Sequence, residues 1–489
     1  MPIPFDNSFA ALGSPFSTAQ EPDPVKDPSL IRINDRLATQ LGIDPQWLGS
    51  QEGIEVLSGN RVAEGSNPVA AAYAGHQFGH FNPQLGDGRA VLLGEVVDQH
   101  QHRYDLQLKG SGRTDWSRGG DGRSPLGPVL REYIVSEAMA ALGVPTTRAL
   151  AAVATGERVM RDGIEPGAVL TRVASSHLRV GTMQYFAARE DRQSLATLVS
   201  YILKRHYADK VAAEKPALEL LEAVIAAQAR LIARWQLLGF VHGVMNTDNM
   251  LLCGETVDYG PCAFMEEFHP ETLFSSIDQQ GRYAYCNQPG IAQWNLARLA
   301  EALLPLINDD TDAAVEEAKN ALSQFTPLFE EAYQEGLAKK LGLEGFTETD
   351  IALADGLFAA LQEDQADFTL AFRFLADEIN PGGPNTGAGA LFKPGQKLLE
   401  WLPLWAQRQQ AEAGRAEEKQ ARMFAANPAF IPRNHLIQRA IEEGEAGDYG
   451  LFHRLVTRLE NPAHYTVADS DLALPAQPQE KVMRTFCGT

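Results

Sequence analysis

The spacing of apolar residues changes near residue 175, and this change limits the folds open to the chain. Before it, strand-like runs occupy residues 90–97 and 104–109, and in the second run Tyr104, Leu106 and Leu108 share one face. After it, residues 194–207 and 218–238 carry the apolar periodicity of long helices. A chain whose strands are concentrated in its first part and whose helices follow is predicted to have an α+β fold.

Other segments fit this order. A helix is expected over residues 129–145, where Leu130, Ile134 and Ala138 recur every four residues and Gly143 with Pro145 ends the pattern. The Pro-, Ser- and Asn-rich first 70 residues predict an irregular arm with one short helix near residues 31–41. The remaining expectations are strands over residues 146–155 and 167–175, and helices over residues 313–341, 352–361 and 397–425.

Composition narrows the classes of function. The 489 residues carry 42 Lys and Arg against 63 Asp and Glu, a net charge of −21, which argues against a general nucleic-acid binder. No apolar run reaches the ~18 residues that would span a bilayer, so no membrane role is expected. The N-terminal sequence MPIPFDNSFA does not look like a secretory signal, and a soluble, cytoplasmic protein is expected. The cysteines Cys253, Cys262, Cys286 and Cys487 lack zinc-ribbon spacing.

Segment 241–260, VHGVMNTDNMLLCGETVDYG, holds the most informative pattern. A protein-kinase catalytic loop runs H-R-D-L-x-x-x-N and is followed by D-F-G. Here His242 and Asn249 take the first and last positions of that pattern, and Asp258 begins the D-Y-G that replaces D-F-G. The position of the kinase base is Val244, which cannot accept a proton, so the usual arrangement for phosphoryl transfer is broken.

Upstream residues complete a kinase-like order. Lys109 ends a predicted strand, as the phosphate-binding lysine of a kinase does, and Glu132 lies on the next predicted helix, where its ion-pair partner would be. Each sign is weak alone, but together and in this order they are fairly specific. The sequence therefore predicts a protein-kinase-like fold with a small β-rich N-lobe and a large helical C-lobe, with an N-terminal arm and a C-terminal helical extension.

Several long strings resemble the selenoprotein O family, protein adenylyltransferases with a pseudokinase fold. The resemblance covers most of the chain and is concentrated in its first 300 residues. It is carried by YAGHQFGHFNPQLGDGRA (residues 73–90), LQLKGSGRTDWSRGGDGR (106–123), REYIVSEAM (131–139), RVASSHLRVGT (172–182), HGVMNTDNM (242–250), VDYGPCAF (257–264) and QPGIAQWNLARLA (288–300), with a weaker echo in NPAFIPRNHLIQRAI (427–441).

The resemblance implies an activity and a site. It implies ATP bound in an inverted orientation, with AMP transferred to Ser, Thr or Tyr hydroxyls of protein substrates and pyrophosphate released. Asp248 matches the proton acceptor, and Asn249 and Asp258 match ligands of Mg²⁺, with Mn²⁺ possible as the alternative metal. The positions that match nucleotide-binding residues are Gly86, Gly88, Arg89, Lys109, Asp121, Gly122, Arg172, Arg179 and Asp258.

Physical chemistry agrees with these assignments. Negative charge develops on departing pyrophosphate, so cations must face it, and Arg89, Lys109, Arg172 and Arg179 are available together with a metal ion. Glycines such as Gly86 would let backbone N–H groups approach phosphate oxygens without a Cβ in the way.

Two alternatives stay open. One is a divergent protein kinase, for which Asp248 would have to replace the missing base. The other is a non-catalytic pseudokinase that binds nucleotide; Val244 favours it, whereas the joint presence of Lys109, Asn249 and Asp258 opposes it.

Three further expectations concern organisation and two smaller features. The expected divisions are an arm at residues 1–70, an N-lobe at 71–175, a C-lobe with insertions at 176–425, and a C-terminal extension and tail at 426–489. His76 and His80 have the spacing of two helical zinc ligands, but Gly75 and Gly79 argue against a helix, so a hydrogen-bonded structural pair is favoured. Cys487, near the C-terminus, suggests a redox link.

Overall fold

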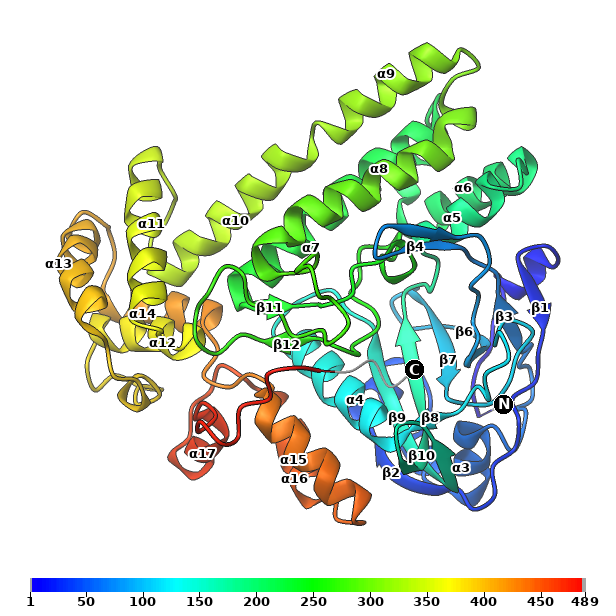
Figure 1. The fold of residues 1–489 in the computed structure, drawn as a ribbon, viewed down its shortest axis with the longest axis horizontal. Coiled ribbons are helices and arrows are strands. Elements are labelled where there is room, and N and C mark those ends of the chain that lie inside the picture. The colour runs from blue at the N-terminus through cyan, green and yellow to red at the C-terminus, as the bar shows by residue number, and fades with distance from the viewer. Residues whose placement is uncertain (1, 486–489) are drawn as a thin grey trace.

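The computed structural model describes residues 2–485 and divides into a β-rich N-terminal part and a helical C-terminal part (Figure 1). The mixed architecture and its order along the chain agree with the prediction. Cys487 lies outside the described residues.

A large antiparallel sheet is the main element of the N-terminal part. Its central strands are β6 (Ala90–Val97), β7 (Arg103–Lys109), β10 (Ile164–Ala174) and β9 (Arg148–Met160), so all four predicted strands are present. In the sheet the order is β1 (Ser17–Ala19), β3 (Val69–Ala71), β6, β7, β10, β9 and β2 (Ser29–Ile33), with β8 (Ser124–Pro125) also pairing with β10.

The first 70 residues are more ordered than predicted. The short helix predicted near residues 31–41 is present as α1 (Asp35–Gln40), but the chain also forms β2 at an edge of the sheet and the helices α2 (Pro45–Leu48) and α3 (Gln51–Ser58). The prediction of an irregular arm was wrong here because β1 and β2 are short edge strands, and their pairing depends on distant partners instead of a local pattern.

Helix α4 (Leu126–Ala141) packs against β9 and β10 and is buried along most of its length. The C-terminal helices α15 (Asn434–Glu445) and α16 (Gly450–Leu459) cover it (Figure 1). The Arg131 guanidinium donates to Asn434 Oδ1 at 3.0 Å, and the rings of Tyr133 and Phe452 lie 5.5 Å apart. The C-terminal segment therefore fixes the helix that carries Glu132.

The helical part is built around α7 (Pro216–Leu238), which contacts α8 (Gln288–Ile307) and α10 (Phe325–Leu341). Gly239 caps α7 at φ 67°, where a Cβ would lie 2.9 Å from the Phe368 ring. The other helices are α5 (Val180–Ala187), α6 (Arg192–His206), α9 (Thr311–Leu322), α11 (Glu348–Glu363), α12 (Phe368–Ile379), α13 (Gln396–Gln410), α14 (Ala416–Ala426) and α17 (Ser470–Ala473).

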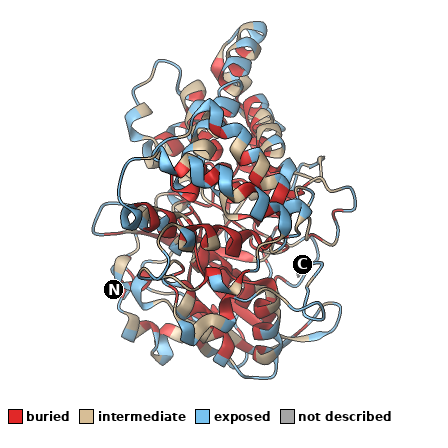
Figure 2. Cartoon of the chain, turned by 90° about the vertical axis from the view of Figure 1, so that its left-hand side faces the viewer, coloured by how far each residue is buried: buried red, intermediate tan, exposed pale blue. Residues whose placement is uncertain are grey.

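Two predicted helices are each divided. The pattern over residues 313–341 forms α9 and α10, with a break at Ser323 and Gln324, and the pattern over 397–425 forms α13 and α14 around Gly414, whose φ is 93°. Apolar periodicity continues across both breaks, and packing decides them: α9 lies on α7 and α8, whereas α10 lies on α7 and α14. Buried residues run through both parts of the molecule (Figure 2). Among the described residues, no helix has the length and apolar character needed to cross a bilayer.

Lys340 is buried in the helical part. It is 4% exposed, and its Nζ lies 4.0 Å from the centre of the Phe372 ring and 5.4 Å from that of Phe368. Burial lowers the pKa of this ammonium to about 7. Cation–π contact therefore does not offset the loss of hydration.

We expect Lys340→Met to stabilise the protein. In the unfolded chain this lysine keeps its ordinary high pKa, so keeping the folded pKa near 7 costs up to about 5 kcal/mol at low pH, part of which Met would recover. Because the folded pKa is depressed, the cost is greatest below pH 7 and fades as pH rises toward 10. Urea unfolding at pH 6, 7.5 and 9.5 measures this, with exposed Lys339→Met as the control; a gain independent of pH would contradict the charge explanation.

Candidate active site

Four charged side chains from distant parts of the sequence form one cluster. Lys109 Nζ lies 2.6 Å from Glu132 Oε2 and 2.8 Å from Asp258 Oδ1. Arg172 Nη2 lies 2.6 Å from Glu132 Oε1 and 3.8 Å from Asp258 Oδ1. Two cations thus face two carboxylates. The predicted ion pair of Lys109 with Glu132 is one of the contacts in this four-residue cluster.

Strand register places the two cations on one face of the sheet. Lys109 pairs across the strands with Leu170, and Gln107 pairs with Arg172, so Lys109 and Arg172 project from the same face of β7 and β10. Helix α4 crosses this face and brings Glu132 between them, while Asp258 comes from the loop before β12 (Ala263–Phe264).

Asp258 is an ionised carboxylate in this setting. Burial opposes its charge, but Lys109, Arg172 and Arg89 outweigh burial and hold the pKa of Asp258 well below its usual range. Its side chain keeps 23% exposure, whereas Glu132 is buried, so Asp258 is the carboxylate of the cluster that stays accessible. Its φ of 69° is unusual for a residue with a side chain.

The predicted catalytic loop lies beside the cluster. His242 is buried, stacks on Trp235 at 5.2 Å, and its Nε2 lies 2.9 Å from the Val257 carbonyl oxygen. Asn249 donates from Nδ2 to the Val244 carbonyl oxygen at 3.0 Å. These contacts join the segment of Val244 and Asn249 to the segment that precedes Asp258.

Asp248 is enclosed on several sides. It is 8% exposed, and burial raises its pKa to about 6, although a hydrogen bond from Gln77 and the charge of Arg179 act in the other direction. Arg179 Nη1 donates to the Asp248 backbone oxygen at 2.8 Å, and the same guanidinium lies 4.3 Å from the centre of the Tyr73 ring. The structure thus places Arg179 next to Asp248, and Arg172 in the charge cluster.

The predicted glycines lie in two loops that pack on their neighbours. Gly86 has φ 77°, and a Cβ there would lie 2.3 Å from the Trp116 side chain; at Gly88 it would lie 2.8 Å from the Trp116 carbonyl oxygen. Packing against Trp116 therefore already requires glycine at both positions. The predicted approach of their N–H groups to phosphate remains a prediction.

Asp121 and Gly122 are not brought into the charge cluster. Asp121 is half-exposed and pairs with Arg161 at 2.9 Å. Gly122 has φ 67°, and a Cβ there would lie 1.9 Å from the Gly112 carbonyl oxygen. Both residues stabilise the loop between β7 and α4, and their contact with nucleotide remains a prediction.

Comparison with known proteins gives a consistent result. A family model described as "Protein adenylyltransferase SelO" matches residues 1–460. Proteins called "Protein nucleotidyltransferase YdiU" from Nitrobacter hamburgensis (strain DSM 10229 / NCIMB 13809 / X14) and Rhodopseudomonas palustris (strain BisB5) are each 56% identical to this chain, over 488 and 489 residues. The matches cover 100% of this chain and 97% and 99% of those relatives.

The chain belongs to the SelO family. The resemblance found in the sequence is therefore confirmed, and the chain is an enzyme of the nucleotidyltransferase class. The ion pair of Lys109 with Glu132 and the enclosure of Asp248 are therefore features of a SelO-family protein, and the roles of these residues stay predictions.

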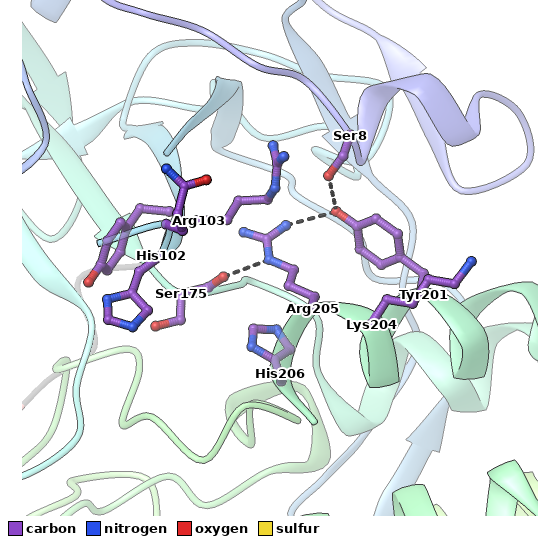
Figure 3. Close-up of a pocket in the computed structure, with 10 residues that line it drawn as sticks. Ser8, His102, Arg103, Ser175, Tyr201, Lys204, Arg205 and His206 are labelled. Atoms are coloured by element: carbon purple, nitrogen blue, oxygen red, sulfur yellow. Dashed lines mark hydrogen bonds between the residues drawn. The ribbon is translucent and has the colours of Figure 1, made fainter. Parts of the chain in front are cut away.

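Two cavities lie beside the segments described above, and neither is lined by a predicted site residue. One, of about 890 Å³, is bordered by Val244 and Gly260 of the loops described above and by the buried Arg131. The other, of about 700 Å³, is lined by basic and tyrosine side chains and holds none of the predicted site residues (Figure 3).

Arg205 is the central cation of this second cavity, and its hydrogen bonds are already made. It donates to the Ser175 carbonyl oxygen at 2.8 Å (Figure 3). It also donates to Asp105 Oδ1 at 2.6 Å and pairs with Glu95. The second cavity therefore surrounds a structural ion network that ties α6 to the sheet.

Several contacts at the site were not foreseen from the sequence. Gln77 reaches Asp248, Tyr73 lies under Arg179, and Gln184 accepts a hydrogen bond from Thr247 at 2.7 Å. His76 is hydrogen-bonded to Gln184 at 2.8 Å, as a structural histidine would be. No short pattern marks these residues, although Tyr73, His76 and Gln77 lie in the first string that carries the family resemblance.

We expect Glu132→Gln to weaken both the fold and nucleotide binding. Glu132 is 3% exposed and is paired with both Lys109 and Arg172, so removing its charge leaves two buried cations with one fewer counter-charge, at a cost of about 3 kcal/mol. Glu157→Gln, which removes a longer 3.7 Å contact to Arg123, is the control and should change stability by less than about 1 kcal/mol. Urea midpoints and ATP titration measure the two effects; equal midpoints for the two variants would refute this ranking.

Proposed function

We propose that this enzyme transfers AMP from ATP to a Ser, Thr or Tyr hydroxyl of a protein substrate, with ATP bound in the inverted orientation. The observation that carries the proposal is the exchange of roles in the catalytic loop: Val244 occupies the position of the kinase base, whereas a carboxylate, Asp248, lies four residues later beside Arg179. Family membership supports nucleotidyl transfer in general.

The proposal includes a kinase-like plan for the molecule. The β-rich part, with Lys109 on β7 and Glu132 on α4, corresponds to a kinase N-lobe, and the helical part, with the 242–258 segment, corresponds to the C-lobe. The proposed boundaries between arm, N-lobe, C-lobe and C-terminal extension lie after residues 70, 175 and 425, except that β1 and β2 of the arm belong to the N-lobe sheet.

The proposed chemical step is a substitution at the α-phosphorus. The acceptor oxygen forms a bond to that phosphorus, the bond to the oxygen bridging to the β-phosphorus breaks, and pyrophosphate leaves. The proton of the hydroxyl passes to the carboxylate of Asp248, whose pKa of about 6 suits a base that is ionised near neutral pH. Arg89, Lys109, Arg172 and Arg179 supply positive charge for the pyrophosphate.

The residues fit a divalent cation. Asn249 and the ionised Asp258 together provide one amide and one carboxylate, oxygen donors that Mg²⁺ accepts alongside phosphate oxygens and water, and Mn²⁺ takes similar ligands. The ion would neutralise charge on the phosphates. Within the chain, Lys109 and Arg172 hold Asp258 in its ionised form for this purpose.

ATP labelled at either the α- or the γ-phosphate tests the proposal. We expect the purified enzyme, with Mg²⁺ and a mixture of acceptor proteins, to leave label on protein only from α-labelled ATP. Label from γ-labelled ATP alone would instead make the chain a divergent kinase. EDTA should abolish the transfer, and excess Mg²⁺ should restore it.

Variants then test the assigned residues. Asp258→Asn should lower transfer at least about 100-fold by removing the metal carboxylate, and Asp248→Asn by a similar factor while ATP still binds. Asp162→Asn, on the exposed turn between β9 and β10, is the matched control and should retain activity. Full activity in Asp248→Asn would show that another group takes the proton.

A further inference from the structure

A hairpin inserted between β3 and β6 lies directly on the catalytic loop. Its strands are β4 (Gly75–Gln77) and β5 (His80–Asn82), which pair only with each other. The hairpin contacts three consecutive residues of the loop. His76 N donates to Thr247 Oγ1 at 2.6 Å, Phe78 N donates to Asn246 Oδ1 at 3.1 Å, and Gln77 Nε2 donates to Asp248 Oδ2 at 3.1 Å.

Successive side chains of β4 point to opposite faces, so one face contacts Asp248 and the other anchors the hairpin. Gly75 and Gln77 share the face that meets Asp248, and His76 points to the opposite face. There His76 is anchored by Gln184, which also accepts from Thr247, and its ring lies 4.9 Å from Phe81. The anchored face holds the hairpin in place, so the position of Gln77 is fixed by more than its own hydrogen bond.

The two carboxylate oxygens of Asp248 differ in their hydrogen bonding. Oδ2 accepts from Gln77, the one side-chain donor to this carboxylate among residues 2–485. Oδ1 is buried and finds no hydrogen-bond partner within the described part of the chain. Gly75 lies against it so closely that a Cβ there would come within 2.6 Å of Oδ1. A buried acceptor left unpaired is unfavourable in the resting protein, and at a reaction centre it leaves a lone pair for an incoming donor.

We propose that Gln77 is a positioning residue for AMP transfer: by holding Oδ2 of Asp248, it orients the carboxylate so that Oδ1 receives the proton of the acceptor hydroxyl. Gly75 keeps the space beside Oδ1 free of a side chain. The proposal rests on the proposed function, in which that proton leaves as the acceptor oxygen bonds to the α-phosphorus and pyrophosphate departs. Among the described residues the side chain of Gln77 hydrogen-bonds to Asp248 and not to Lys109, Arg172 or Asp258, so its effect should concern the chemical step and not nucleotide binding.

The test compares Gln77→Met with Gln84→Met. Methionine has nearly the length of glutamine but cannot donate a hydrogen bond, and Gln84 is exposed in the same segment, so it controls for the substitution itself. We expect Gln77→Met to lower kcat for transfer from α-labelled ATP about tenfold, with KM for ATP, ATP affinity and melting temperature unchanged. Gln77→Glu, which has the same shape but replaces the donor by an acceptor, should lose at least as much kcat.

Gly75→Ala approaches the same carboxylate from the other side. Its Cβ would displace Oδ1, so kcat should again fall while ATP binding is kept. If Gln77→Met has wild-type kcat, or if kcat, KM and melting temperature all change together, Gln77 is not a positioning residue. If the wild type itself transfers no α-label, the proposed function fails first, and the inference fails with it.

Discussion

The fold depends on the charge cluster of Lys109, Glu132, Arg172 and Asp258, because it joins three separately formed units. The sheet supplies both cations, α4 supplies Glu132, and the loop before β12 supplies Asp258. Charges buried to this degree are tolerated only when each has a partner, so the sheet, the helix and the loop must come together in one arrangement. The arrangement leaves Asp258 ionised and partly exposed, while Glu132 serves the fold.

Elements remote from the cluster hold its members in place. The C-terminal helices α15 and α16 pack on α4, and the Arg131–Asn434 hydrogen bond ties this helix to the end of the chain. On the other side, the β4–β5 hairpin fixes the loop of Asp248. The candidate site therefore depends on segments about 350 residues apart in the sequence, both of which lie within the residues that the family model matches.

Much of this could be predicted because the signals are local. The alternation in 104–109 and the four-residue repeat in α4 identified the strand of Lys109 and the helix of Glu132, whereas the roles of Asn249 and Asp258 stay predictions. What failed were features decided by distant partners: the edge strands β1 and β2, and the breaks between α9 and α10 and between α13 and α14. The sequence did not predict a role for Gln77 for the same reason, since its partner Asp248 is 171 residues away.

The sequence by itself determined the order of strands and helices and the family, because each is encoded in local periodicity or in consecutive residues. Only the tertiary structure decided which groups meet: that Arg172 shares Glu132 with Lys109, that Arg179 reaches the backbone of Asp248, and that Asp121 pairs with Arg161 away from the cluster. The physical reason is that ion pairs and hydrogen bonds act over a few ångströms in space, whatever the separation along the chain.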